Sequence, residues 1–256
     1  MKNLQIIFLA FASVFSCDKI DRIEGMGPIV ETIIEVDDFK GIESEIAATI
    51  HLTQGDEIEL MAKGHQNIID RLRTRVNNDR LNIDLENGSY KDFELTLYIT
   101  IPDLNFLKVD GAGSFKASAF EVEKMRCEID GTGSIDFEST LALTGDFRMD
   151  IDGSGDTYIQ NLQANDVKVN VDGAGDITLR GVAKNLEVHI DGLGDVQAFV
   201  LECKTAEVYV NGLGKTEVMA TEALEVDIDG IGNVYYKGEP TINKSIDGLG
   251  KLINAN

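Results

Sequence analysis

The sequence predicts an all-β protein, a parallel β-solenoid with rungs of about 20 residues that follows a smaller β-rich domain. The 256 residues include 25 glycines, only three prolines and no tryptophan, which argues against collagen and against a helical bundle. An Asp/Asn-Gly-x-Gly tetrad also recurs eight times, at intervals of 20, 22, 20, 19, 20, 18 and 18 residues, and this period suits one solenoid rung. The tetrads begin at Asp110, Asp130, Asp152, Asp172, Asp191, Asn211, Asp229 and Asp247.

The first part of the chain is typical of an export signal. Residues 1–16 hold one early lysine and then a short apolar run, which predicts a signal peptide. Val14 and Ser16 before Cys17 resemble a bacterial lipoprotein cleavage site, so we expect Cys17 to carry a lipid and residues 17–27 to form a tether. This predicts an outer membrane lipoprotein on the periplasmic or cell-surface side. An ordinary secretory signal followed by an incidental cysteine is the alternative.

Residues 28–105 are predicted to form the N-terminal β-rich domain. Apolar and polar residues alternate in Ile42–Leu52, Leu81–Leu85 and Phe93–Ile99, as in half-buried strands. The segment 67–76 fits a short helix or another strand equally well. No tetrad occurs in this part of the chain.

Residues 106–256 are predicted to form the solenoid. Apolar side chains occupy every second position from Leu186 to Ile190, and Gly192 and Gly194 continue the same phase. Both glycines of each tetrad are therefore expected to face inward, where the missing Cβ lets the chain bend or a neighbouring backbone approach. The predicted structural glycines are Gly111, Gly113, Gly131, Gly133, Gly153, Gly155, Gly173, Gly175, Gly192, Gly194, Gly212, Gly214, Gly230, Gly232, Gly248 and Gly250.

Charge and cysteine content limit the partners. Forty-five acidic and 23 basic residues give a formal net charge of -22, which repels phosphate backbones and anionic surfaces. Nucleic acid is therefore not expected as a partner, whereas cations, neutral glycans and basic protein surfaces are compatible. Besides Cys17, only Cys127 and Cys203 remain, too few for a disulfide framework, so packing must supply the stability.

These features together resemble a known bacterial family. The resemblance rests on Phe39-x-x-Ile42, on Ile50-x-Leu52-x-Gln54-Gly55, on Leu81-Asn82-Ile83 and on the serial tetrads. This pattern is similar to that of the "putative autotransporter adhesin, head GIN domain" family and covers nearly the whole mature chain. The resemblance implies an all-β, solenoid-like exported protein, often a lipoprotein in Bacteroidota, and it brings no catalytic residues with it.

The tetrads also raise a calcium hypothesis. Acidic residues at both ends of the tetrads share an outward phase, and carboxylates stacked at the rung spacing repel one another unless a cation relieves them. The candidates are Asp152, Asp156, Asp172, Asp176, Asp191 and Asp195. Lys215 and Lys251 take the corresponding place in two other copies, where a ligand would be needed. We therefore favour aspartates that hydrogen-bond the local backbone, and we expect no cofactor.

The variable position of the tetrad predicts an interaction stripe. It is small in the first four copies, Ala112, Thr132, Ser154 and Ala174, and bulky in the last four, Leu193, Leu213, Ile231 and Leu249. Outward-facing leucines and isoleucines in a row would mark a contact with another chain, including a second copy. The alternative is that each corner folds this residue against neighbouring turns of its own domain.

The sequence holds no motif for catalysis. It lacks a Gly-x-Ser-x-Gly elbow, a His-Glu-x-x-His pair and a phosphate-binding loop with lysine. We therefore predict no catalytic residues and a non-catalytic envelope protein whose repeat faces serve adhesion or protein or glycan binding. A carbohydrate-active enzyme, a polysaccharide lyase or hydrolase on a β-helix, is the first alternative. A calcium-stabilised solenoid module is the second.

Overall fold

The computed structural model describes residues 22–256 and confirms the all-β fold. In this part of the chain there are 22 strands and one short helix, α1 (Gln66–Ile69). Twenty strands share one sheet, while β1 pairs with β8 apart from it. The predicted signal peptide 1–16 and Cys17 lie outside the described residues, as do residues 18–21 of the predicted tether 17–27.

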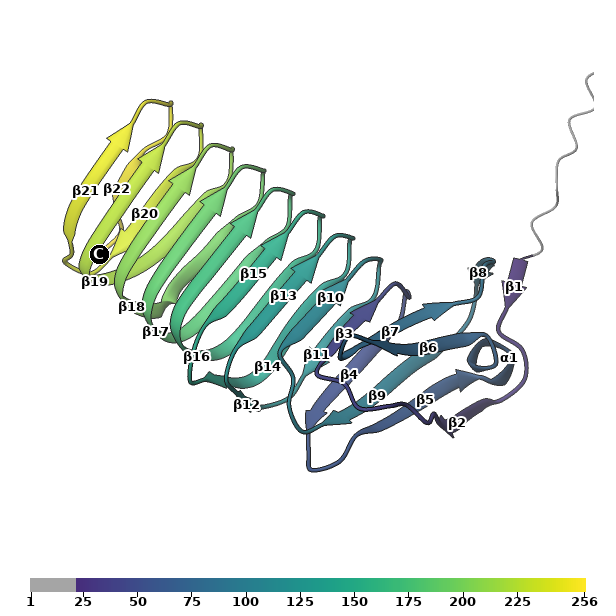
Figure 1. The fold of residues 1–256 in the computed structure, drawn as a ribbon. Coiled ribbons are helices and arrows are strands. Elements are labelled where there is room, and N and C mark those ends of the chain that lie inside the picture. The colour runs from purple at the N-terminus through teal and green to yellow at the C-terminus, as the bar shows by residue number, and fades with distance from the viewer. Residues whose placement is uncertain (1–21) are drawn as a thin grey trace, which may run out of the picture.

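The second half of the chain forms the predicted parallel solenoid, whose rungs stack along a straight prism (Figure 1). In-register pairing joins Val169 to Val188, Val188 to Val208 and Val208 to Val226, so equivalent residues form columns. The strands are β10 (Phe106–Val109), β11 (Ser114–Ala117), β12 (Phe120–Val122), β13 (Met125–Ile129), β14 (Ser134–Leu143), β15 (Phe147–Ile151), β16 (Asp156–Val171), β17 (Ile177–Ile190), β18 (Val196–Val210), β19 (Lys215–Ile228), β20 (Asn233–Lys237), β21 (Thr241–Ile246) and β22 (Leu252–Asn254).

Each rung consists of straight runs joined by irregularities, as β16 illustrates. Thr157 and Ile159 are buried in its first run, Leu162 in the second, and alternate residues from Val167 to Val171 in the third. The pairing register between β16 and β17 shifts between Ile159 and Leu162, where the chain turns. Buried and exposed residues alternate strictly within each run, and the phase of this alternation changes from one run to the next. One continuous chain can therefore surround one apolar core.

The tetrad glycines allow successive corners to stack closely. A Cβ on Gly173 would lie 1.8 Å from the carbonyl oxygen of Gly153, and one on Gly175 would lie 1.9 Å from that of Gly155. Positive φ angles occur at other glycines of the described chain and at none of the tetrad glycines. The corners therefore require glycine for close backbone approach, and not for a left-handed conformation.

The solenoid begins before the first tetrad. β3 (Gly41–Ser44) and β4 (Thr49–Gln54) pair in parallel with β10 and β11, so sheet and core continue across the predicted boundary at residue 105. Between β3 and β4, Ile46 and Ala48 stand where later corners carry glycine. After β7 (Arg80–Leu85) the chain leaves the stack of rungs to form β8. No corner of a preceding rung therefore lies against Ile46 and Ala48. A shallow pocket of about 340 Å³ lies beside Ile46 instead.

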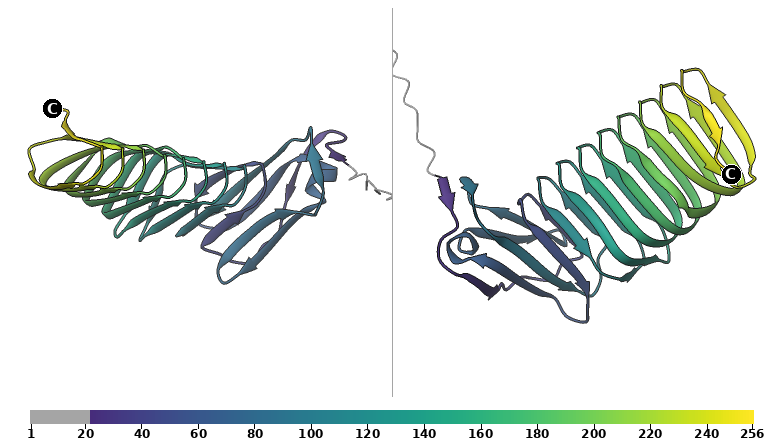
Figure 2. Two further views of the ribbon diagram at one scale, coloured as in Figure 1. Left: turned by 90° about the horizontal axis from the view of Figure 1, so that it is seen from above. Right: turned by 180° about the vertical axis from the view of Figure 1, so that it is seen from behind.

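Antiparallel strands close the N-terminal end of the stack, opposite the end that holds the C-terminus (Figure 2). β5 pairs antiparallel with β2 and β9, and β6 pairs antiparallel with β7. The ambiguous segment 67–76 contains both structures, because α1 ends at Ile69 and β6 begins at Leu72. The remaining strands are β1 (Arg22–Glu24), β2 (Ile29–Ile33), β5 (Glu59–His65), β6 (Leu72–Asn77), β8 (Ser89–Lys91) and β9 (Leu95–Ile101). Across residues 22–256, no helix has the length and apolar character needed to span a bilayer.

Candidate functional site

The solenoid face that precedes the tetrads carries its outward side chains in two columns. Parallel pairing from β13 to β19 places each outward residue about 4.8 Å from its equivalent on the next rung. The charged column consists of Arg126, Arg148, Lys168, Glu187, Glu207 and Glu225. The polar column consists of Glu128, Asp150, Asn170, His189, Tyr209 and Asp227.

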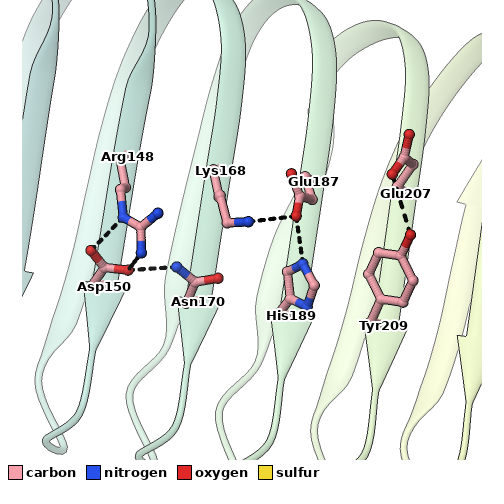
Figure 3. A network of polar contacts seen from close by, with 8 residues as sticks. All are labelled: Arg148, Asp150, Lys168, Asn170, Glu187, His189, Glu207 and Tyr209. Carbon is pink, nitrogen blue, oxygen red and sulfur yellow. Dashed lines mark hydrogen bonds and ion pairs between the residues drawn. The ribbon is translucent and has the colours of Figure 1, made fainter.

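Asp150 is the most heavily hydrogen-bonded residue of this face. Arg148 donates from Nε to Asp150 Oδ2 over 2.7 Å and from Nη2 to Oδ1 over 2.8 Å, and Asn170 Nδ2 also donates to Oδ1 (Figure 3). Partial burial acts to raise the pKa of Asp150, but the hydrogen bonds from Arg148 and Asn170 outweigh it and lower the pKa. Asp150 therefore stays ionised and fixes the orientation of both neighbours.

A second cluster lies one and two rungs further along. Lys168 Nζ and His189 Nε2 both lie 2.6 Å from Glu187 Oε1 (Figure 3). The hydrogen bond from Lys168 is the main reason that the pKa of Glu187 is lowered. The ring of His189 stacks on that of Tyr209 with centroids 4.6 Å apart and an interplanar angle of 14°. Side chains of three successive rungs thus hold one another in place.

A shallow groove of about 550 Å³ runs across these rungs. Its lining residues are Arg126, Glu128, Asp130, Arg148, Asp150, Asp152, Lys168, Asn170, Asp172, His189 and Asp191. Along the tetrad side, Asp152, Asp172 and Asp191 stack at successive corners. Partial desolvation, and then the charges of Asp152 and Asp191, raise the pKa of Asp172. The groove therefore combines fixed cations with a rim of closely spaced carboxylates.

Several groups of the groove keep free hydrogen-bonding capacity. Within residues 22–256, no amide, ammonium or guanidinium group donates to the carboxylates of Asp152 or Asp172. The side-chain oxygen of Asn170 and Nδ1 of His189 are likewise not used in the contacts of Figure 3. These atoms offer acceptors beside the donors of Arg126, Arg148 and Lys168, so the groove presents both kinds of partner to a ligand.

The calcium candidates divide into two groups with different surroundings. Asp152, Asp172 and Asp191 line the groove, whereas the other three follow the glycines of their tetrads. Asp156 Oδ1 accepts the backbone N–H of Asp176 over 2.9 Å. In the same way, the carboxylate of Asp176 accepts the backbone N–H of Asp195, and that of Asp195 accepts the backbone N–H of Lys215, each from the next rung. In the described part of the chain, no group of three or more His, Cys, Asp or Glu residues is arranged to hold a metal ion.

The predicted interaction stripe is exposed. Leu193, Leu213, Ile231 and Leu249 are 60%, 56%, 55% and 78% exposed. The backbone N–H of each donates to the first tetrad glycine of the preceding rung over 2.8 to 3.0 Å, which keeps the four residues in one line. The alternative, in which the corner folds these side chains against its own domain, is wrong.

Cys127 and Cys203 are packing residues. Both are buried and free, and burial raises the pKa of the Cys203 thiol to about 12. Burial raises the pKa of Cys127 as well. Thiols with such pKa values remain protonated and unreactive at neutral pH.

The groove was not predicted from the sequence. Its charged residues occupy alternating outward positions, which in a single strand look like any solvated face. A signal was nevertheless present, because Arg126, Arg148 and Lys168 recur at the period of the tetrads. Only the register of the rungs shows that they stand side by side.

Comparisons with known proteins agree with this architecture. The family model described as "Putative auto-transporter adhesin, head GIN domain" matches residues 38–240. A Parabacteroides distasonis structure described as a "putative lipid binding protein" is 25% identical, with a TM-score of 0.87, covering 92% of this chain and 100% of that one. Two structures described as a "putative adhesin", from Parabacteroides distasonis and Parabacteroides merdae, are 24% and 18% identical, with TM-scores of 0.83 and 0.81. Both alignments cover 92% of this chain and 100% of the other. No curated protein matches the chain. The family match spans well over half of the sequence, and the chain therefore belongs to the family described as "Putative auto-transporter adhesin, head GIN domain".

Proposed function

We propose that this protein is a non-catalytic binding module of the cell envelope that holds a neutral glycan in the groove. The observation that carries the proposal is the set of side chains oriented along three successive rungs, with donors and acceptors alternating on one open surface. Sugar hydroxyls both donate and accept hydrogen bonds, so a polyhydroxylated chain can use both kinds of group at once.

The charge of the molecule favours a neutral ligand over an anionic one. Three cations line the groove, but six carboxylates line it as well, and the whole chain has a formal charge of -22. A polyanion would be repelled at long range. The stacked rings of His189 and Tyr209 add an apolar surface at one end of the groove, on which a sugar ring can pack.

Membership of the family supports a function at the cell envelope. The family and two of the similar structures are described as adhesins, and a third structure is described as a lipid binding protein. A lipid on Cys17 after removal of residues 1–16 would hold the solenoid at the outer membrane. Metabolic labelling with a palmitate analogue tests this part: label on the wild type and none on Cys17→Ser is the expected result, and an unlabelled wild type would refute the anchor.

The binding test uses fluorescently labelled neutral polysaccharides titrated with the protein. Asn170→Ala and His189→Ala are each expected to weaken binding roughly fivefold, because each removes about one hydrogen bond to the ligand. Gln197→Ala is the matched control, since Gln197 is an exposed polar residue outside the groove. Equal binding by all four proteins, or binding by none, would refute the groove as a glycan site.

An enzyme acting on the same glycan is the second candidate, and the raised pKa of Asp172 favours it. Glycoside hydrolases use a carboxyl group of raised pKa as general acid with a second carboxyl group nearby, and Asp172, whose pKa is raised, lies between Asp152 and Asp191. Chromatography of the polysaccharide after long incubation with the protein distinguishes binding alone from hydrolysis. Intact polysaccharide supports binding without catalysis, whereas shortened chains that disappear with Asp172→Asn would show hydrolysis.

A further inference from the structure

The apolar stripe of Leu193, Leu213, Ile231 and Leu249 is a ridge confined to the later rungs. These four residues are four of the eleven large apolar side chains exposed in the described chain, and they alone stand in an unbroken row. The same position holds Ala112, Thr132, Ser154 and Ala174 in the earlier rungs. An exposed apolar row of this kind marks a surface that another molecule covers.

The two flanks of the stripe differ in charge. The flank before the glycines consists of Asp191, Asn211, Asp229 and Asp247, and is acidic. The flank after them consists of Asp195, Lys215, Asn233 and Lys251. Lys215 already pairs with Glu217. Asp247 and Lys251 have no ion-pair partner among residues 22–256, so both charges at the end of the stripe are available to another molecule.

The spacing of the stripe identifies a partner with the same repeat. Its side chains follow one another at about 4.8 Å, the distance between hydrogen-bonded rungs. A second copy of this chain presents the same row at the same spacing, and two such rows can interlock along their whole length. Association of identical surfaces about a two-fold axis also closes on itself, without forming filaments.

The flanking charges select one of two ways to pair the stripes. If the two solenoids ran antiparallel, the acidic flanks would face each other, with Asp247 of one copy near Asp191 of the other, and like charges would repel. If they run parallel, the acidic flank of each copy faces the lysine-bearing flank of the other. Asp247 of each copy then lies opposite Lys251 of the other, so the two-fold axis gives two such pairs.

We propose that two copies associate along this stripe as a parallel dimer whose two-fold axis runs along the solenoid. The four side chains bury much less than the roughly 800 Å² per partner of a stable complex, so the dimer is weak in dilute solution. The parallel arrangement brings Arg22, where the described chain begins, to the same end of the dimer in both copies. Chains held at one surface would therefore dimerise far more readily than free chains.

Sedimentation velocity over a range of protein concentrations tests the surface. The wild type is expected to dimerise with rising concentration, and Leu213→Asp to weaken the dimer about tenfold or more, since it would bury an unpaired charge. Val200→Asp is the matched control, because Val200 is 62% exposed and lies outside the stripe. A wild type that stays monomeric throughout, or equal effects of both variants, would overturn the proposal.

A charge exchange tests the orientation. Asp247→Lys alone is expected to weaken the dimer, and the double variant Asp247→Lys with Lys251→Asp to restore it. Stronger association of Asp247→Lys alone would indicate antiparallel pairing and overturn the parallel arrangement. In a Cys17→Ser background, Leu249→Cys alone should form a disulfide-linked dimer on oxidation, because each stripe residue meets its own equivalent in the parallel dimer. An intermolecular disulfide that forms only when Leu193→Cys is also present would contradict the parallel arrangement.

Discussion

The earlier and later rungs of the solenoid share one backbone and differ on the outside. The core column of Val169, Val188 and Val208 runs through both parts without a break, as do the two columns of tetrad glycines. Outside, the charged column changes from basic at Lys168 to acidic at Glu187. The variable tetrad position changes from small to bulky within the same few rungs.

This difference shows that the scaffold and the binding surfaces are independent. Glycines and inward apolar residues determine the stacking, and every rung needs them alike. The outward residues are free to vary, so the earlier rungs carry most of the groove and the later rungs carry the stripe. Substitutions of inward residues should therefore affect both surfaces, and substitutions of outward residues only one.

The largest expected effect comes from the glycine columns. Gly173→Ala and Gly212→Ala should each lower the free energy of unfolding by about 2–4 kcal/mol, because each new Cβ would meet a carbonyl oxygen 1.8 or 2.0 Å away. Urea unfolding followed by circular dichroism measures this. The control Ala174→Ser, at an exposed tetrad position, should stay within about 0.5 kcal/mol. A large loss at one glycine and none at the other would show that the two halves differ in scaffold.

A smaller effect is expected from lengthening the stripe. Ala174 occupies the tetrad position one rung before Leu193, so Ala174→Leu should extend the row by one side chain. We expect a dimer that is roughly threefold to tenfold tighter, from the added apolar contact, with unchanged unfolding. Sedimentation velocity reads this out. The same substitution at Ala112, three rungs further from the stripe, should leave association unchanged, and a similar gain there would argue against a continuous stripe.

The stacked aspartates give a still smaller, pH-dependent effect. Because the pKa of Asp172 is raised, the folded protein holds this proton more tightly, and stability is lost as the pH rises through the ordinary aspartate pKa toward the raised one. Asp172→Asn should therefore be slightly more stable than the wild type at pH 7, by less than about 0.5 kcal/mol since the site is exposed. The wild type and Asp172→Asn should have the same stability at low pH. Thermal unfolding at both pH values checks this, and a less stable variant at pH 7 would contradict it.

Calcium is expected to have no effect at all. The carboxylates of Asp156, Asp176 and Asp195 are already engaged with backbone N–H groups. Among residues 22–256, the stacked Asp152, Asp172 and Asp191 belong to no group of three or more ligands that is arranged to hold a metal ion. Calorimetric titration with calcium should show no heat of binding, and the melting temperature should not change. A calcium-dependent rise in melting temperature that is lost in Asp172→Asn would instead place an ion at the stacked aspartates.

Much of this architecture could be predicted because the repeat carries its own phase. The alternation from Leu186 through Gly192 and Gly194 shows which side chains face inward, and with them the outward direction of Leu193. The start of the solenoid could not be found in this way. Ile46 and Ala48 replace glycine at the first corner, where no earlier corner requires the space, so the first rung lacks the signal that marks the others.

The groove could not be predicted because it depends on contacts between rungs. Arg148 and Asp150 are two residues apart, and their pairing is local, but Asn170 reaches Asp150 only through the register of β15 and β16. The length of each rung varies between tetrads, so a residue's partner on the next rung follows from the structure. The segment 67–76 was ambiguous for a related reason, since it contains both a helical turn and a strand.

Sedimentation velocity with a fluorescent glycan, which follows protein and glycan separately, is the most direct test of two binding surfaces on one scaffold. The proteins to compare are the wild type, Asn170→Ala and Leu213→Asp. We predict that Asn170→Ala loses glycan yet still dimerises, and that Leu213→Asp stays monomeric yet still carries glycan. Loss of both properties in either variant would contradict this division of the solenoid.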